Sequence, residues 1–316
     1  MIMRETTLGR TGLQTAVAGL GCGGHSALGL KRHGEKHAAT IVRAAYDAGV
    51  TFFDTAKKYG TQSAVEQGLA GLARDSYILS TKFDPMNKSD RTLKSVDEFS
   101  ATLDESLRVL RTDYIDIYHL QGVFYDLYPQ VCARFIPALQ QAKEQGKIRF
   151  TAVSEDFPGD TDHKMLRTAL EGDFFDVYML GYNLLNQSAA RTILPRSQSR
   201  GVGTLCMYAV RNMLSTPERL RANIELILAA GQADPEKLSA DEDLSFIIKE
   251  GAAQSITEAA YRFCSNTEGI NIVLTGTGSM EHLRENIAAI NAPPLPGAIL
   301  EKLSAMFGNV DCIAGN

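Results

Sequence analysis

Short apolar runs alternate with longer segments of helical periodicity from residue 15 onward. Runs rich in β-branched and aromatic residues, each followed by a helix-compatible segment, are typical of parallel strands joined by helices. We expect strands near Thr15–Leu20, Val50–Asp54, Tyr77–Lys82, Tyr114–Gln121, Ile148–Ser154, Phe175–Leu180, Val202–Tyr208 and Ile270–Thr275. Eight such units predict an α/β fold, a closed (β/α)₈ TIM barrel that forms a single domain over residues 1–316.

Two segments stand outside this alternation. Thr7–Leu13 is compatible with two short strands around a glycine-containing turn, an N-terminal β-hairpin that would plug the bottom of the barrel. Residues 215–249 are longer than a simple strand-to-helix connection, so we expect an extra helix over Pro217–Ala230 with a mobile loop after it.

An open dinucleotide-binding sheet is the main alternative architecture. It would show a GxGxxG turn that opens its first helix, and Gly19–Gly24 matches that pattern only weakly. The barrel is therefore preferred. In barrels of this kind the chemistry sits at the C-terminal ends of the strands.

Composition narrows the possible partners. The net charge of −5 and the pI near 5.7 provide no basic stripe for a nucleic acid. The five cysteines are far apart and form no CxxC pair, so we expect reduced, buried thiols and no metal site. No apolar stretch is long enough to span a membrane, and the charged N-terminus does not match a signal peptide, so we expect a cytoplasmic protein.

The first candidate for chemistry is a group of three residues at predicted strand ends. Asp54 ends one strand, Tyr59 follows it by five residues, and Lys82 ends the next strand. A buried lysine needs a partner, which Asp54 would supply. If Lys82 stays cationic beside Tyr59, it lowers a phenol pKa that starts at about 10 and makes Tyr59 a usable acid and base. The alternative is a purely structural ion pair beside a packed tyrosine.

The motif around these residues resembles the aldo-keto reductases, in which Asp, Tyr, Lys and His form a catalytic tetrad. The resemblance covers nearly the whole chain, and it rests on the order and spacing of several weak motifs rather than on one strong match. These motifs are Leu8–Leu13, Asp54–Gly60, Ser80–Lys82, Asp113–Tyr118, Gly146–Arg149, Ser154, Tyr182–Leu185 and Glu285–Asn286. The resemblance implies catalytic roles for Asp54, Tyr59 and Lys82, and a nicotinamide cofactor.

The catalytic histidine of the family is replaced in this chain. Gln121 occupies its position, and His119 lies two residues earlier, about 6–7 Å deeper along the strand, where we expect a hydrogen-bonded core side chain. Gln121 can still donate an amide N–H to a substrate carbonyl, so we include it in the catalytic set. His25, in the loop after the first strand, could supply the missing imidazole, although a solvated loop histidine is the simpler interpretation.

The resemblance also places the nicotinamide, with a second departure from the family pattern. The family binds the carboxamide with Ser-Asn after the fifth strand and Gln on the sixth, and this chain has Ser154, Glu155 and Met179 there. Glu155 can accept from the amide NH₂ but repels the carbonyl end when it is ionised, whereas Met179 offers only soft contact. Met207 or Tyr208 would pack on the ring.

The rest of the dinucleotide would lie after the eighth strand. A glycine-rich turn leads there onto a helix N-terminus suited to phosphate, and its candidate residues are Gly276, Thr277, Gly278, Ser279, His282 and Asn286. Family members that use NADP usually place Lys or Arg in this segment, where this chain has Gly276 and His282 with Arg284 nearby. The resemblance favours NADP, and NAD stays possible.

We therefore expect an NAD(P)-dependent oxidoreductase of the carbonyl reductase or alcohol dehydrogenase type, acting on a small-molecule aldehyde, ketone or the corresponding alcohol. One alternative is a cofactor-binding sensor or regulatory barrel with weak or lost turnover, motivated by Gln121, Glu155 and Met179. Another is an aldolase in which Lys82 forms a Schiff base, against which its neighbour Asp54 argues. The sequence leaves the substrate and the oligomeric state open.

Overall fold

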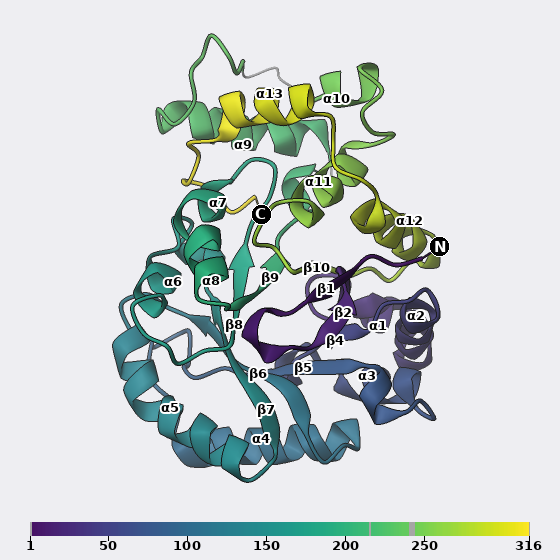
Figure 1. Cartoon of the computed structure of the whole chain (residues 1–316), viewed down its shortest axis with the longest axis vertical. Coiled ribbons are helices and arrows are strands. Elements are labelled where there is room, and N and C mark those ends of the chain that lie inside the picture. The colour runs from purple at the N-terminus through teal and green to yellow at the C-terminus, as the bar shows by residue number, and fades with distance from the viewer. Residues whose placement is uncertain (1, 215, 240–243, 316) are drawn as a thin grey trace.

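A closed barrel of parallel strands forms the centre of the computed structural model, which describes residues 2–214, 216–239 and 244–315 (Figure 1). The barrel order is β10-β3-β4-β5-β6-β7-β8-β9. The strands are β3 (Ala18–Gly21), β4 (Phe52–Asp54), β5 (Ile78–Phe83), β6 (Ile115–Val123), β7 (Ile148–Glu155), β8 (Val177–Gly181), β9 (Gly203–Met207) and β10 (Ile272–Thr275). The predicted TIM barrel is thus confirmed.

Helices surround the barrel and follow its strands (Figure 1). They are α1 (Leu30–His33), α2 (Glu35–Asp47), α3 (Gln62–Leu69), α4 (Val96–Leu110), α5 (Tyr128–Glu144), α6 (Lys164–Ala169), α7 (Ser188–Thr192), α8 (Leu194–Ser199), α9 (Pro217–Ala229), α10 (Phe246–Lys249), α11 (Ile256–Ser265), α12 (Met280–Asn291) and α13 (Gly297–Phe307). Local sequence sets several of their ends. Ser95 and Glu98, for example, form a reciprocal capping box at the start of α4.

The N-terminal hairpin is present, but its strands differ from the predicted ones. β1 (Glu5–Thr7) pairs with β2 (Gln14–Ala16), so the run predicted as one strand over Thr15–Leu20 is divided between β2 and β3. The turn between them places Leu8, which is fully buried, in the inner apolar cluster of the barrel. The hairpin therefore closes the N-terminal end of the barrel, as expected.

The segment after β9 holds the expected extra helix, α9. Of the loop predicted after it, residues 240–243 lie outside the described residues, and the described part includes α10. α9, α10 and α13 gather at the top of Figure 1, where the Lys302 ammonium of α13 lies 3.6 Å from the centroid of the Phe246 ring of α10.

The structure also bears on two expectations from the sequence, the burial of the cysteines and the absence of a membrane-spanning segment. Cys22, Cys206 and Cys264 are buried free thiols, but Cys312 is exposed, because it lies in the C-terminal tail beyond α13; the expectation of buried thiols is wrong there. Within the described part of the chain, no helix is long and apolar enough to cross a membrane.

Candidate active site

The candidate catalytic residues meet because neighbouring barrel strands align their C-terminal ends. In the strand register Asp54 lies beside Ser80, and Lys82 lies beside His119. Side chains two residues apart on a strand share a face. Phe52, Ile78 and Ile117 belong to the inner cluster, so the polar side chains that follow them at spacings of two also face the interior.

A buried ion pair anchors this group. The Lys82 ammonium donates to Asp54 Oδ1 and, at 3.1 Å, to the carbonyl oxygen of Thr55, while the Ser80 hydroxyl donates to Asp54 Oδ1 at 2.7 Å. Burial lowers the pKa of Lys82, and the Asp54 carboxylate opposes that shift. Asp54 is therefore the partner that the sequence predicted, and the side chain of Lys82 has no exposed surface.

Tyr59 projects from a 3₁₀ turn, Lys57–Tyr59, that Gly60 terminates in a left-handed conformation. The Gln121 amide nitrogen donates to the Tyr59 hydroxyl oxygen at 2.9 Å, and Lys82 Nζ lies 5.5 Å from the ring centroid. Burial, followed by the Asp54 charge, raises the pKa of Tyr59, and the bond from Gln121 opposes the rise. This direction is opposite to the expected one, because burial of the phenol, and then the nearby Asp54 charge, disfavour the phenolate. In this state Tyr59 is a neutral phenol.

His119 lies deeper, inside the barrel. It is fully buried, and its Nε2 lies 3.1 Å from the Ser80 hydroxyl oxygen. Burial, and then the Lys82 charge, lower its pKa well below the ordinary value, so the imidazole is neutral. The expectation of a hydrogen-bonded core histidine agrees with this placement. His25, in contrast, is exposed at the mouth of the cavity described next.

A cavity of about 630 Å³ opens above these residues and is lined by Asp54, Tyr59 and Gln121. A second hollow of about 860 Å³ adjoins it, and Val210, Tyr261 and Gly276 line both. The two hollows, which share these three residues, together form a groove from Tyr59 to α12. Such a groove suits an elongated ligand with one end at Tyr59.

Four of the residues predicted to hold a nicotinamide line this cavity, but not all of their polar groups are available to a ligand. Ser154, Met179, Met207 and Tyr208 line it, but the Ser154 hydroxyl already accepts from the Gly122 N–H at 2.9 Å. That bond stabilises an irregularity of β6, where Gly122 has a φ of +60° beside Gln121.

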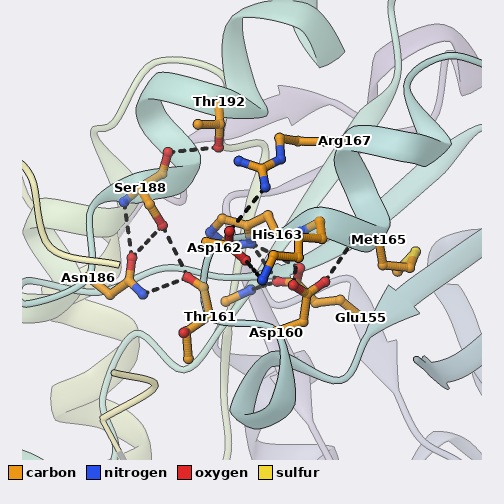
Figure 2. A network of polar contacts seen from close by, with 12 residues as sticks. Glu155, Asp160, Thr161, Asp162, His163, Met165, Arg167, Asn186, Ser188 and Thr192 are labelled. Carbon is orange, nitrogen blue, oxygen red and sulfur yellow. Dashed lines mark hydrogen bonds and ion pairs between the residues drawn. The ribbon is translucent and has the colours of Figure 1, made fainter. Parts of the chain in front are cut away.

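Glu155 forms part of the cavity wall, but its carboxylate is turned to a buried histidine (Figure 2). Both carboxylate oxygens lie 2.9 Å from His163 Nδ1, and Oε1 accepts from the Gly181 N–H at 2.8 Å. Burial raises the pKa of the Glu155 carboxyl, and His163 opposes the rise. Sequence reasoning missed His163, because no motif links it to Glu155.

A second missed residue is Arg211. Its guanidinium carbon lies 3.9 Å from the centroid of the Tyr208 ring, and its buried Nε has no hydrogen-bond partner among the described residues. Tyr208 has a φ of +69°, which L-residues rarely adopt, and its ring meets the Phe157 ring edge to face. The only available signal was the position of Arg211 just after a strand end.

The predicted dinucleotide residues divide into two groups. Gly276, Thr277, His282 and Asn286 line the outer part of the groove, and the Asn286 amide donates to the Thr275 hydroxyl at 3.0 Å.

Gly278 and Ser279, the other two predicted dinucleotide residues, have structural roles in the neighbouring loop and helix. A Cβ on Gly278 would lie 2.7 Å from backbone atoms of Gly29, so this glycine allows a close approach of two loops. The Ser279 hydroxyl accepts from the His282 N–H at 3.3 Å and caps α12.

Comparison with known proteins agrees with this geometry. The sequence profile of the aldo/keto reductase family matches residues 20–305, and the chain belongs to this family. It is 29% identical to L-galactose dehydrogenase of Arabidopsis thaliana over 94% of this chain and 91% of that protein. It is 26% identical to L-glyceraldehyde 3-phosphate reductase of Escherichia coli (strain K12) over 79% of this chain and 78% of that protein.

Solved structures show the same fold. The holo form of aldo-keto reductase AKR11C1 from Bacillus halodurans has a TM-score of 0.74 at 23% identity and covers 96% of each chain. The thermostable aldo-keto reductase Tm1743, in complex with the inhibitor epalrestat, has a TM-score of 0.70 at 21% identity over 96% of this chain and 99% of that one. Family membership makes the chain an oxidoreductase of the aldo-keto reductase type, a class that uses nicotinamide cofactors.

Proposed function

We propose that the protein interconverts a small alcohol and its carbonyl compound, with a nicotinamide dinucleotide in the groove. The observation that carries the proposal is the bond from Gln121 to the Tyr59 hydroxyl at the cavity wall, beside the buried Asp54–Lys82 pair. This arrangement supports proton transfer at one defined point of the cavity.

The direction of the Gln121 bond determines where the Tyr59 proton can go. Because the phenol oxygen accepts from Gln121, its own hydrogen is free to donate to a substrate carbonyl oxygen in the cavity. Gln121 keeps a second amide hydrogen that can stabilise the same oxygen as negative charge develops. A bound nicotinamide supplies the hydride in reduction and accepts it in oxidation. The oxidative direction requires Tyr59 as the phenolate, which forms when the phenol releases its proton to solvent in the cavity and then takes the proton of the alcohol. The Lys82 ammonium, 5.5 Å from the ring centroid, favours that anion.

The walls of the groove offer the chemistry that a dinucleotide requires. Met207 and Tyr208 would flank the ring, with Ser154 and Met179 near its carboxamide. Arg211 has a buried Nε–H without a partner in the described part of the chain and would hold an anionic group of the cofactor. The backbone of Gly276 and Thr277 would serve the part that lies toward α12.

For the choice between the two dinucleotides, the outer groove supports NAD(H). Its described lining includes Glu258 and Glu285 but no lysine or arginine, and His282 is its one basic side chain. A 2′-phosphate normally requires a charge-assisted bond from a cation, whereas carboxylates repel it. The family resemblance favours NADP, but these residues favour the cofactor without the extra phosphate.

The relatives suggest a substrate class. One is named for a sugar and the other for a phosphorylated three-carbon aldehyde. We propose small, hydroxyl-rich aldehydes or the matching alcohols. The Schiff-base alternative is disfavoured, because the Lys82 ammonium is buried in an ion pair with Asp54, which favours the charged, non-nucleophilic form of the amine.

Two measurements test the proposal. Fluorescence titration with NADH and NADPH should show tighter binding of NADH. Initial rates with a panel of sugar-type aldehydes and alcohols should then show turnover. Binding without turnover on any substrate would instead support the cofactor-binding sensor, and binding of neither dinucleotide would contradict the proposal as a whole.

A further inference from the structure

Three side chains in the cavity wall would meet the carboxamide of a bound nicotinamide. They are Ser154 near the end of β7, Glu155 beside it, and Met179, the register partner of Ser154 on β8. A carboxamide has two unlike parts, since its carbonyl oxygen accepts hydrogen bonds and its NH₂ donates them. The groups that these three side chains present therefore determine which part of the carboxamide the protein can bind.

Glu155 carries the strongest acceptor of the three, but the structure closes it to a ligand. Its side chain has no exposed surface. Both carboxylate oxygens lie 2.9 Å from His163 Nδ1 (Figure 2), and Oε1 also accepts from the Gly181 N–H at 2.8 Å. The Glu155 carboxyl group therefore holds the loop that carries His163, and it is not available to the NH₂ of a carboxamide.

Met179 and Ser154 offer a carboxamide one free donor, which belongs to Ser154. Met179 has only a thioether, which is a weak acceptor, and it is 3% exposed in the inner apolar cluster of the barrel. The Ser154 oxygen accepts from the Gly122 N–H at 2.9 Å, and the hydroxyl hydrogen has no acceptor among the described residues. That hydrogen suits the carbonyl oxygen of the carboxamide and not its NH₂.

The rest of this wall provides packing surface for a ring. Met207, the register partner of Gly181 on β9, and Tyr208 after it are partly buried and line the cavity. The Phe157 ring meets the Tyr208 ring edge to face, with 5.4 Å between the centroids, and so helps to fix the orientation of the tyrosine. Thioethers and aromatic side chains pack favourably on a flat ring. The wall therefore suits the pyridine ring itself better than its NH₂ group.

We propose that the protein holds the pyridine ring by packing and by one hydrogen bond from Ser154, and that Met179 makes it indifferent to the carboxamide NH₂. The inference rests on the proposed function. Dinucleotides with another acyl group on the ring are then equally good ligands, and 3-acetylpyridine adenine dinucleotide, with methyl in place of NH₂, is the simplest of them. Beside Met179 the methyl group finds an apolar neighbour, whereas an NH₂ loses hydrogen bonds to water without a full replacement.

Calorimetric titration of the wild type with NAD⁺ and with 3-acetylpyridine adenine dinucleotide tests this directly. Both ligands are oxidised, carry the same ring charge and keep the carbonyl oxygen, so they differ only in NH₂ against methyl. The Kd for the acetylpyridine compound should be no more than about twice that for NAD⁺. A ratio of about five to ten, the size expected when a hydrogen bond to the NH₂ is lost, would overturn the inference.

Met179→Gln supplies the missing acceptor, because glutamine has a similar length and a carbonyl oxygen. The Kd ratio of acetylpyridine compound to NAD⁺ should rise about fivefold over wild type. Met179→Leu, which keeps an apolar side chain of similar volume, should leave the ratio within about twofold of wild type. An unchanged ratio in a Met179→Gln variant that binds NAD⁺ would overturn the role given to Met179. If that variant does not fold, the ratio of the wild type decides.

The outcomes separate the two proposals. Failure of the wild type to bind any nicotinamide dinucleotide would overturn the proposed function. Normal binding of NAD⁺ together with a strong preference for it over the acetylpyridine compound would overturn only the inference about the carboxamide.

Discussion

Replacing Gln121 by Met tests the role given to the residue at the histidine position. Gln121 is 8% exposed, and its amide nitrogen lies 2.9 Å from the Tyr59 hydroxyl oxygen. Methionine has a similar length and fills the same space, but it removes both amide hydrogens. Loss of one preorganised donor to a developing oxyanion costs about 3 kcal/mol, so kcat/KM for carbonyl reduction should fall roughly a hundredfold or more.

Initial rates of NADH oxidation would measure the loss of kcat/KM, and an NADH titration would measure any change in cofactor affinity. Affinity for NADH should stay within about twofold, because the lost bond acts on the substrate oxygen. Gln62→Met is the matched control, since Gln62 is also buried and donates to the hydroxyls of Thr81 and Ser106, both at 3.0 Å, away from the cavity. An unchanged kcat/KM in Gln121→Met, or an equal loss in Gln62→Met, would refute the reasoning.

Three further variants test the histidine position, the outer part of the groove and the N-terminal hairpin. Gln121→His should retain activity and add a titration near about pH 6–7 to the pH–rate profile, and a profile identical to wild type would place position 121 outside the reacting centre. Glu285→Lys should tighten NADPH by about 1–2 kcal/mol in a fluorescence titration and NADH much less, and equal changes would show that no 2′-phosphate lies nearby. Leu8→Ala should lower the free energy of unfolding by about 2–5 kcal/mol in urea without weakening NADH, and a loss below about 1 kcal/mol would argue against its role in closing the barrel.

The repeated alternation of strands and helices was enough to predict the barrel, because each buried parallel strand forms a short apolar run that its own sequence displays. The hairpin was predicted in the right place with the wrong strand ends. Ala16 and Ala18 belong to one continuous apolar run, although the chain leaves the hairpin and enters the barrel between them. A pattern along one segment does not reveal which neighbour each half will pair with.

The sequence was enough to predict those parts of the candidate site that depend on which residues lie at or just after the strand ends. Asp54 and Lys82 converge because the register of adjacent strands aligns them, and Gln121 follows His119 on the same face of β6. Tyr59 reaches the same place from the 3₁₀ turn after β4. The direction of the pKa shift of Tyr59 was not predictable, because it depends first on how deeply the folded barrel buries the phenol. The partner of Glu155 was equally hidden, since His163 reaches it through a left-handed turn with a φ of +61° that no local motif signals.

The central claim is that hydride passes between a nicotinamide ring and a carbonyl carbon while Tyr59 moves the proton. The most direct test follows deuterium from NADH labelled at the reactive carbon into the alcohol product, for wild type and for Tyr59→Phe, with NADH affinity measured in parallel. Wild type should give labelled product, and Tyr59→Phe should do so at a rate at least about a hundredfold lower, with an NADH affinity within severalfold of wild type. Deuterium transfer at an undiminished rate in Tyr59→Phe would contradict the claim.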